Sequence, residues 1–286
     1  MWYISIFLSV LFMSGTNIID KILAKWDDRS FSLFIRYTTN ALLLSILAYL
    51  LHTSQTTTQN IVILMTTGIL NYLVIIMMYR GLRVTHVWLF FVVAYLYIVF
   101  LYFVNIALFG SWELFSIWKL LFGIWFLLCV LLIVYLTGGE KKHVSPTSYL
   151  YALGCALGWT VSIGISAYMT KTAWVEPVRS LSFEALGSSL FWCVIFLSER
   201  RNYPKKKYHI DECYAPVLSG ITISIALSLL LTSYLYLPAN IANLISLSEL
   251  LSTMLLGYIF LHEKLEKQIV LLILVAFCFL IGFSWV

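Results

Sequence analysis

The sequence predicts an all-α, polytopic membrane protein with ten transmembrane helices in two inverted five-helix repeats. The prediction depends on the composition, the length of the apolar blocks and a weak internal repeat. Of the 286 residues, 62% are hydrophobic and only 11% are charged, whereas a soluble domain is about half apolar and about a quarter charged. This composition excludes a disordered chain and a nucleic-acid-binding module. The apolar residues form blocks of about 20, the length of a helix that spans a bilayer.

The apolar blocks define the elements in order. The ten predicted spans are 2–22, 31–51, 61–80, 86–109, 117–136, 148–170, 180–198, 215–236, 240–261 and 268–286. Each can cross about 30 Å of hydrocarbon as a helix. The joints between them carry charges or helix breakers, as in Asp27-Asp28-Arg29, Thr56-Thr57-Thr58, Gly138-Gly139-Glu140-Lys141-Lys142 and Arg200-Arg201. No joint is long enough to form a soluble catalytic domain.

The chain repeats itself weakly. Arg29-Ser30-Phe31-Ser32-Leu33-Phe34 reappears as Arg179-Ser180-Leu181-Ser182-Phe183-Glu184. We therefore divide the chain into a first half, 1–143, and a second half, 144–286. Because each half has an odd number of spans, the two halves must cross the membrane in opposite orientation. Inverted repeats of this kind place a substrate site near the midplane and allow alternating access.

The distribution of Lys and Arg predicts the orientation of the chain. Most of the 18 such residues fall in the joints after spans one, three, five, seven and nine. Only Lys119, Lys171 and Arg179 fall on the opposite side. Cytoplasmic loops collect Lys and Arg, so this count places both termini outside the cytoplasm. Arg36 begins the second span, where we expect its side chain to snorkel to the headgroups.

The ninth span and the joint after it carry a family pattern. Ser248-Glu249-Leu250 is followed by Gly257-Tyr258-Ile259-Phe260-Leu261-His262-Glu263-Lys264-Leu265. This arrangement resembles the EamA-type transporters of the drug/metabolite transporter superfamily, which show a Glu-Pro-like pair, a helix of small residues and Leu-Gly-Glu-x-Leu. The chain has Leu250 in place of the proline and His262 in place of the glycine. The resemblance implies secondary transport, with both termini in the cytoplasm, which conflicts with the Lys and Arg count.

Two acidic residues, Glu184 and Glu249, are taken to lie inside spans. A carboxylate near the middle of a span costs about 2.5–3.5 kcal/mol to insert, so it usually faces a cavity or a partner. Glu249 is therefore the main candidate for a functional group. Three interpretations stay open. Glu249 could carry a coupling proton, because burial disfavours the charged form of a carboxyl group; it could pair with a cationic solute; or it could be a neutral group that bonds a neighbouring helix.

Other candidate site residues are polar or aromatic. Asn240, Asn243 and Ser246 share a helical face with Glu249. Asn17 and Asn71 are expected to be interior polar groups of the first and third spans. Four aromatic residues of spans four and six are candidates for holding a cation or stacking on an aromatic solute: Trp88, Tyr95, Trp159 and Tyr168.

Small residues recur every fourth position in spans six and eight. They are Gly154, Gly158, Ser162 and Ser166 in the sixth span, and Gly220, Ser224, Ser228 and Thr232 in the eighth. Such stripes let helix backbones approach closely. We expect packing inside one bundle, with a moving seam or a homodimer contact as the alternatives.

Taken together, these features predict a secondary transporter of a small organic solute, such as an amino acid, an amine or another metabolite. Coupling of this transport to protons stays open. The alternative is a non-transporting membrane scaffold or a lipid-handling subunit. Without a Walker loop, an HExxH motif or a metal-ligand spacing, we predict no enzyme, no cofactor and no metal. The expected partners are a small-molecule substrate and the lipid bilayer, and no nucleic acid. The expected location is the inner membrane of a prokaryotic cell.

Overall fold

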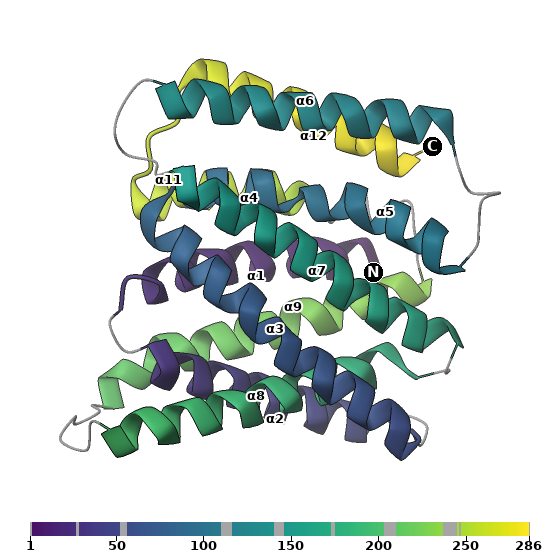
Figure 1. Ribbon diagram of the computed structural model, residues 1–286, viewed down its shortest axis with the longest axis vertical. Coiled ribbons are helices and arrows are strands. Elements are labelled where there is room, and N and C mark those ends of the chain that lie inside the picture. Colours follow the sequence, from purple (N-terminus) through teal and green to yellow (C-terminus); the bar gives the residue numbers. More distant parts are fainter. Residues whose placement is uncertain are drawn as a thin grey trace.

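The computed structural model describes residues 2–26, 29–51, 56–109, 116–139, 146–172, 175–202, 210–236, 245 and 247–285. The described elements are α1 (Trp2–Leu23), α2 (Arg29–Leu50), α3 (Thr58–Val84), α4 (Val87–Ala94), α5 (Leu96–Phe109), α6 (Ile117–Gly139), α7 (Pro146–Thr172), α8 (Pro177–Asn202), the 3₁₀ turn η2 (Ile210–Cys213), α9 (Tyr214–Tyr236), α11 (Ser248–Leu261) and α12 (Lys267–Trp285). Figure 1 shows these helices running between two sides of one bundle.

The prediction of an all-helical, multi-span membrane protein is confirmed. Eight of the described segments are long and apolar enough to cross a membrane by length and composition, and two shorter apolar helices accompany them. The exact number of ten spans and the inverted repeat stay predictions. The C-terminal ends of α1, α3, α6, α8 and α11 lie on the left side of Figure 1, and those of α2, α5, α7 and α9 lie on the right.

The helices differ from the predicted spans mainly at their ends and at one interruption. α3 and α8 continue past the charged residues at which the hydropathy falls. The predicted span 86–109 is divided at Tyr95 into α4 and α5. At this point the backbone N–H of Ile98 donates to the carbonyl oxygen of Tyr95, a separation of three residues instead of four. The helix therefore tightens locally.

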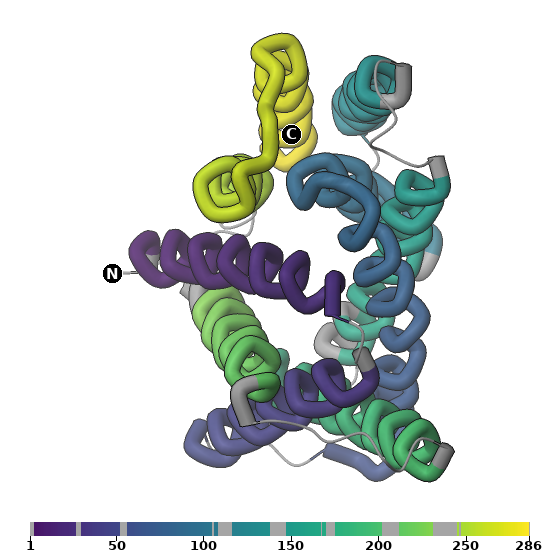
Figure 2. The backbone as a smooth tube through the Cα atoms, turned by 90° about the vertical axis from the view of Figure 1, so that its left-hand side faces the viewer, coloured from purple at the N-terminus to yellow at the C-terminus, as the bar shows by residue number. Residues whose placement is uncertain are grey.

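α4 lies at the centre of the largest apolar cluster. Every residue from Val87 to Ala94 is buried, which explains why this helix is hydrophobic on all sides. α4 contacts α7 and α11, while α1 packs against α9 and α11, and α2 packs against α8 and α9. α6 and α12 pack against each other and form the outer layer at the top of Figure 1. Figure 2, a view along the bundle, shows α1 between α9 and the α4 and α11 pair.

The glycines of the two stripes of small residues pack inside the bundle. A Cβ atom at Gly154 or Gly158 of α7 would overlap a side chain of α3, Met77 and Val74 respectively. A Cβ atom at Gly220 of α9 would lie 2.6 Å from the carbonyl oxygen of Arg36 in α2. Both stripes therefore allow close contact between helices of one chain.

The backbones of α3 and α8 approach each other closely at two glycines. A Cβ atom at Gly68 would overlap the backbone of Glu184, and one at Gly187 would overlap the backbone of Met65. The hydroxyl group of Ser188 donates to the carbonyl oxygen of Gly68 at 2.8 Å. At these two glycines, the contact between α3 and α8 leaves no room for a side chain.

We predict that Gly68→Ala destabilises the protein by about 1–3 kcal/mol, the usual cost of forcing an extra methyl group into a packed site. Gly15→Ala in α1 is the matched control, because a Cβ atom there meets nothing within 4 Å. Thermal unfolding in detergent micelles measures both. Equal midpoints for the two variants would contradict the close approach of α3 and α8.

Candidate functional site

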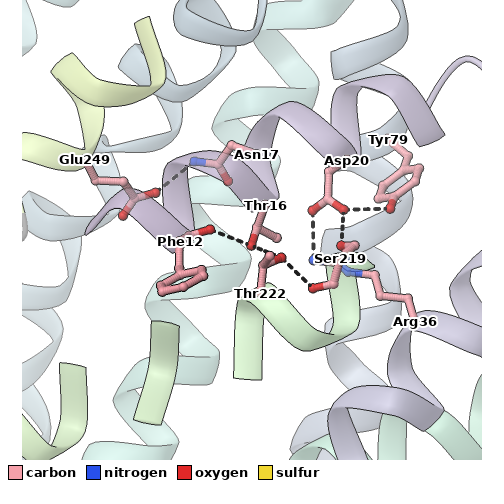
Figure 3. Close-up of polar contacts among 9 residues, drawn as sticks. All are labelled: Phe12, Thr16, Asn17, Asp20, Arg36, Tyr79, Ser219, Thr222 and Glu249. Carbon is pink, nitrogen blue, oxygen red and sulfur yellow. Dashed lines mark hydrogen bonds and ion pairs between the residues drawn. The ribbon is translucent and has the colours of Figure 1, made fainter. Parts of the chain in front are cut away.

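Glu249 lies in the first turn of α11 and faces α1. The side-chain amide of Asn17 donates to Oε1 of Glu249 at 2.9 Å and to the hydroxyl oxygen of Thr253 at 3.1 Å. The hydroxyl group of Ser14 donates to the carbonyl oxygen of Glu249 at 3.3 Å. Figure 3 shows the amide of Asn17 reaching from α1 to this carboxylate. The start of α11 is thus attached to the middle of α1 through polar groups.

A third segment reaches the same carboxylate. The side chain of Tyr95, the residue that separates α4 from α5, lies next to Glu249. Tyr95 is only 4% exposed. A helix interruption, the first turn of another helix and the middle of α1 therefore meet at one carboxyl group. Interrupted helices beside an interior carboxylate are typical of solute sites in membrane transporters.

The structure brings three of the predicted site residues together: Asn17, Tyr95 and Glu249. The predictions for Asn240, Asn243 and Ser246 lie outside the described residues. Asn71 is half-buried on α3, and none of the hydrogen bonds found among the described residues joins it to Glu249.

The remaining aromatic candidates occupy different places. Trp88 is 2% exposed and stacks on His86, with ring centroids 5.9 Å apart. Trp159 of α7 stacks on Phe91 of α4 at 6.2 Å. Tyr168 is 45% exposed, because it lies near the end of α7 on an outer face, and so it does not share the interior with the other three.

The sequence analysis missed an acidic residue and misplaced a basic one. Asp20, which lies inside the predicted span 2–22, forms an ion pair with Arg36, with Oδ2 2.8 Å from Nη2. Both side chains are buried, at 2% and 6% exposure. Arg36 therefore does not snorkel to the headgroups, because a carboxylate of α1 holds it inside the bundle. The spacing of Thr16, Asn17 and Asp20 along α1 was the signal that could have found this pair.

Hydroxyl groups complete the surroundings of this ion pair. Tyr79 of α3 and Ser219 of α9 both donate to Oδ1 of Asp20, at 3.1 and 2.8 Å. One turn away, the hydroxyl group of Thr16 donates to that of Thr222 at 2.8 Å. Figure 3 shows that these groups and the Glu249 contact lie along α1. α1 therefore contacts its neighbours through two separate polar sites, one at Glu249 and one at the Asp20 and Arg36 pair.

Glu184, the second predicted interior acid, is buried in α8. The hydroxyl groups of Ser166 in α7 and Ser180 in α8 donate to its Oε1, at 2.5 and 3.3 Å. Its partners are therefore neutral, and they come from the helix that carries it and from the neighbouring α7. The arrangement is suited to joining α7 and α8.

The corner between α3 and α4 is held from both sides. Nζ of Lys21 in α1 donates to the carbonyl oxygens of Leu82 and Thr85 at the end of α3. The carboxylate of Glu263 accepts the backbone N–H of Val87, with its two oxygens at 2.8 and 3.0 Å. A cation at a helix C-terminus and a carboxylate at a helix N-terminus both satisfy unpaired backbone groups and oppose the helix dipoles.

Together, the fold and these polar sites define a polytopic helical membrane protein with charged groups in its interior. Residues 146–285 match the model of the EamA-like transporter family. The resemblance predicted from the sequence is thus confirmed over these residues. Members of this family are transporters rather than enzymes.

The fold also resembles a solved structure whose description reads "Crystal structure of protein". The TM-score is 0.56 at 15% sequence identity, and the match covers 97% of this chain and 96% of that chain. This likeness concerns the fold alone. The comparison with curated proteins finds no match.

His262 explains one feature of the family pattern. It ends α11 with φ at 53°, in the left-handed region, and it is the only non-glycine residue with positive φ in the described chain. Glycine adopts this conformation without the steric cost that a Cβ atom brings. His262 is therefore a helix C-cap at a position that suits glycine, and it directs the next residue, Glu263, back toward α4.

We predict that His262→Gly stabilises the protein by about 1 kcal/mol, because it removes the strain of a side chain in the left-handed region. Lys264→Gly, at an exposed position two residues later, is the control and should give no gain. Thermal unfolding in detergent compares the two variants. A midpoint for His262→Gly at or below that of Lys264→Gly would refute the assignment.

Proposed function

We propose that this chain is a secondary transporter of a small organic solute, such as an amino acid, an amine or another metabolite. The observation that carries the proposal is the environment of Glu249, where the interruption at Tyr95, the first turn of α11 and the middle of α1 meet; Glu184 has no such interruption beside it in the described helices. This carboxylate contacts only neutral side chains, and no cation pairs with it in the described part of the chain. A membrane-interior carboxylate without a cation is suited to binding a proton or a cationic group in a transport cycle.

The depth of Glu249 supports a site away from both surfaces. From Glu249 to Leu261, α11 rises roughly 18 Å, at about 1.5 Å per residue. This is somewhat more than half of the ~30 Å hydrocarbon thickness. With Leu261 at the edge of the hydrocarbon, Glu249 would lie near the midplane, where inverted-repeat transporters hold their solutes.

The helix contacts support two equivalent halves, 1–143 and 144–286. The main contacts are preserved when each helix of the first half is exchanged for its counterpart in the second half. The exchanged pairs are α1 and α7, α2 and α8, α3 and α9, α4 with α5 and α11, and α6 and α12. The contact of α1 with α9 becomes that of α7 with α3, and the contact of α3 with α8 becomes that of α9 with α2. The pairs α2 with α8, α4 with α11, and α6 with α12 exchange with themselves. Such a scheme permits the halves to rock against each other for alternating access.

The orientation proposed here follows the Lys and Arg count. The ends of α3 and α8 carry Arg80, Arg83, Arg200 and Arg201, and they lie on the left side of Figure 1. That side is the cytoplasmic one under the positive-inside rule.

We predict that Glu249→Gln abolishes solute uptake into proteoliposomes, or removes its dependence on pH, while the protein stays folded. Glutamine keeps the size of the side chain and an oxygen that can accept the hydrogen bond from Asn17, and it removes the charge and the titratable proton. Glu184→Gln is the matched control, because Glu184 is also an interior carboxylate with neutral partners.

The measurement is uptake of labelled amino acids and amines at two pH values, with thermal unfolding as the check on folding. Unchanged uptake and pH dependence in Glu249→Gln would contradict the role of Glu249. A wild-type protein that moves none of these solutes would favour the scaffold or lipid-handling alternative.

A further inference from the structure

Arg36 is the one buried arginine of the described bundle interior, and it lies where four helices meet. It belongs to the second turn of α2 and is 5% exposed. Asp20 reaches it from α1, and the hydroxyl groups of Tyr79 in α3 and Ser219 in α9 surround the same carboxylate. Figure 3 shows the guanidinium group beside this group of side chains.

In this ion pair both carboxylate oxygens of Asp20 have partners, but not all guanidinium nitrogens of Arg36 do in the described part of the chain. Oδ2 of Asp20 contacts Nη2 of Arg36, and Oδ1 accepts two hydroxyl hydrogen bonds. Nε and Nη1 of Arg36 are buried, and they have no hydrogen-bond partner among the residues that the structure describes. Lys21, one residue after Asp20, differs in this respect, because its Nζ donates to two backbone carbonyl groups. Of these two neighbouring buried cations, only Arg36 therefore has nitrogen atoms without a partner in the described structure.

A guanidinium group presents its N–H donors in a rigid, planar fork that matches a carboxylate in a bidentate arrangement. Asp20 uses one donor of Nη2, which leaves the second Nη2 hydrogen and the hydrogens of Nε and Nη1. Leaving such donors buried and unpaired is costly. A purely structural ion pair does not need an arginine with this excess of donors, since buried pairs are often replaceable by apolar residues without loss of stability.

We infer that Arg36 binds the carboxylate group of the transported solute, in a forked arrangement with Nη2 and one of the two unpartnered nitrogens. This inference rests on the proposed transport function and adds the chemical class of the solute. Asp20 then has a second role, since its negative charge competes with the solute for the guanidinium group and limits the affinity.

The position of Arg36 fits a site that the solute meets on its way to Glu249. Arg36 is about 10 Å along α2 from its start at Arg29, on the side of the bundle where the Lys and Arg residues gather. Positive charge at the mouth of a pathway raises the local concentration of anions. Asn17, which contacts Glu249, and Asp20, which contacts Arg36, are neighbours on α1 at i and i+3.

The test uses purified protein in detergent and measures the shift of the unfolding midpoint with added pyruvate, succinate, inorganic phosphate or methylammonium, at matched ionic strength. The variants are Asp20→Asn, Asp20→Asn/Arg36→Gln, and the exposed Arg80→Gln as a control for loss of one arginine. The double variant keeps a neutral, hydrogen-bonding pair, so it preserves the fold where a single loss of Arg36 would leave Asp20 without its cation.

We expect a carboxylate to stabilise the wild type and Arg80→Gln. Asp20→Asn should respond at about tenfold lower concentration, because its competing charge is gone, and the double variant should not respond. The inference would be overturned if a carboxylate still raised the unfolding midpoint of the double variant. It would also be overturned if no carboxylate raised the midpoint of the wild type, or if phosphate alone did so. Glu249→Gln separates the two proposals. Suppose that a carboxylate still raises the unfolding midpoint of Glu249→Gln while liposomes with the wild-type protein take up no carboxylate. That result would support the binding site at Arg36 and refute the transport function.

Discussion

The lipid surroundings impose the constraint on which the rest of this structure depends. Polar groups inside a membrane bundle must find their partners within the chain, because hydrocarbon offers none. In this protein the partners converge on α1. Lys21 binds the end of α3, Asp20 binds α2, α3 and α9, and Asn17 binds α11. A helix that contacts so many neighbours through hydrogen bonds fixes their relative positions more specifically than apolar packing, which is similar at many registers.

The Glu263 and His262 pair shows how a short family pattern follows from local geometry. Glu263 must reach the first backbone N–H of α4, and α11 must therefore end abruptly one residue earlier. A left-handed residue gives that abrupt end, which is why glycine suits the position. Lys21 holds the preceding helix end of the same corner. The corner between α3 and α4 is thus attached both to α1 and to the segment between α11 and α12, and neither attachment is local in sequence.

The sequence analysis could predict what depends on composition and on one helix at a time. Apolar blocks define the helices, and a carboxylate inside a block marks Glu249, because both effects are local. The Asp20 and Arg36 pair was missed, because each residue lies near the end of a predicted span, where a charge commonly faces the headgroups. The polar spacing along α1 indicates an interior face for Asp20, but only the tertiary contact identifies Arg36 as its partner. The division at Tyr95 was missed for a related reason. No glycine or proline marks it, and the tightened turn contains ordinary apolar residues.

The two proposed halves share a contact scheme but not the same chemistry, and this difference bears on coupling. The interface of α1 with α2, α9 and α11 contains the ionisable groups of Asp20, Arg36 and Glu249, whereas the equivalent interface of α7 with α8 has Glu184 among serines. The proposed rocking motion needs similar backbones in the two halves, but it does not need the same ionisable side chains in both. Because Asn17 and Asp20 are one turn apart on α1, a displacement of α1 that changes the contact at Glu249 also changes the contact at Arg36. Ligands that bind the two sites with different affinity in two positions of α1 are then coupled through that helix, and the coupling must be reciprocal.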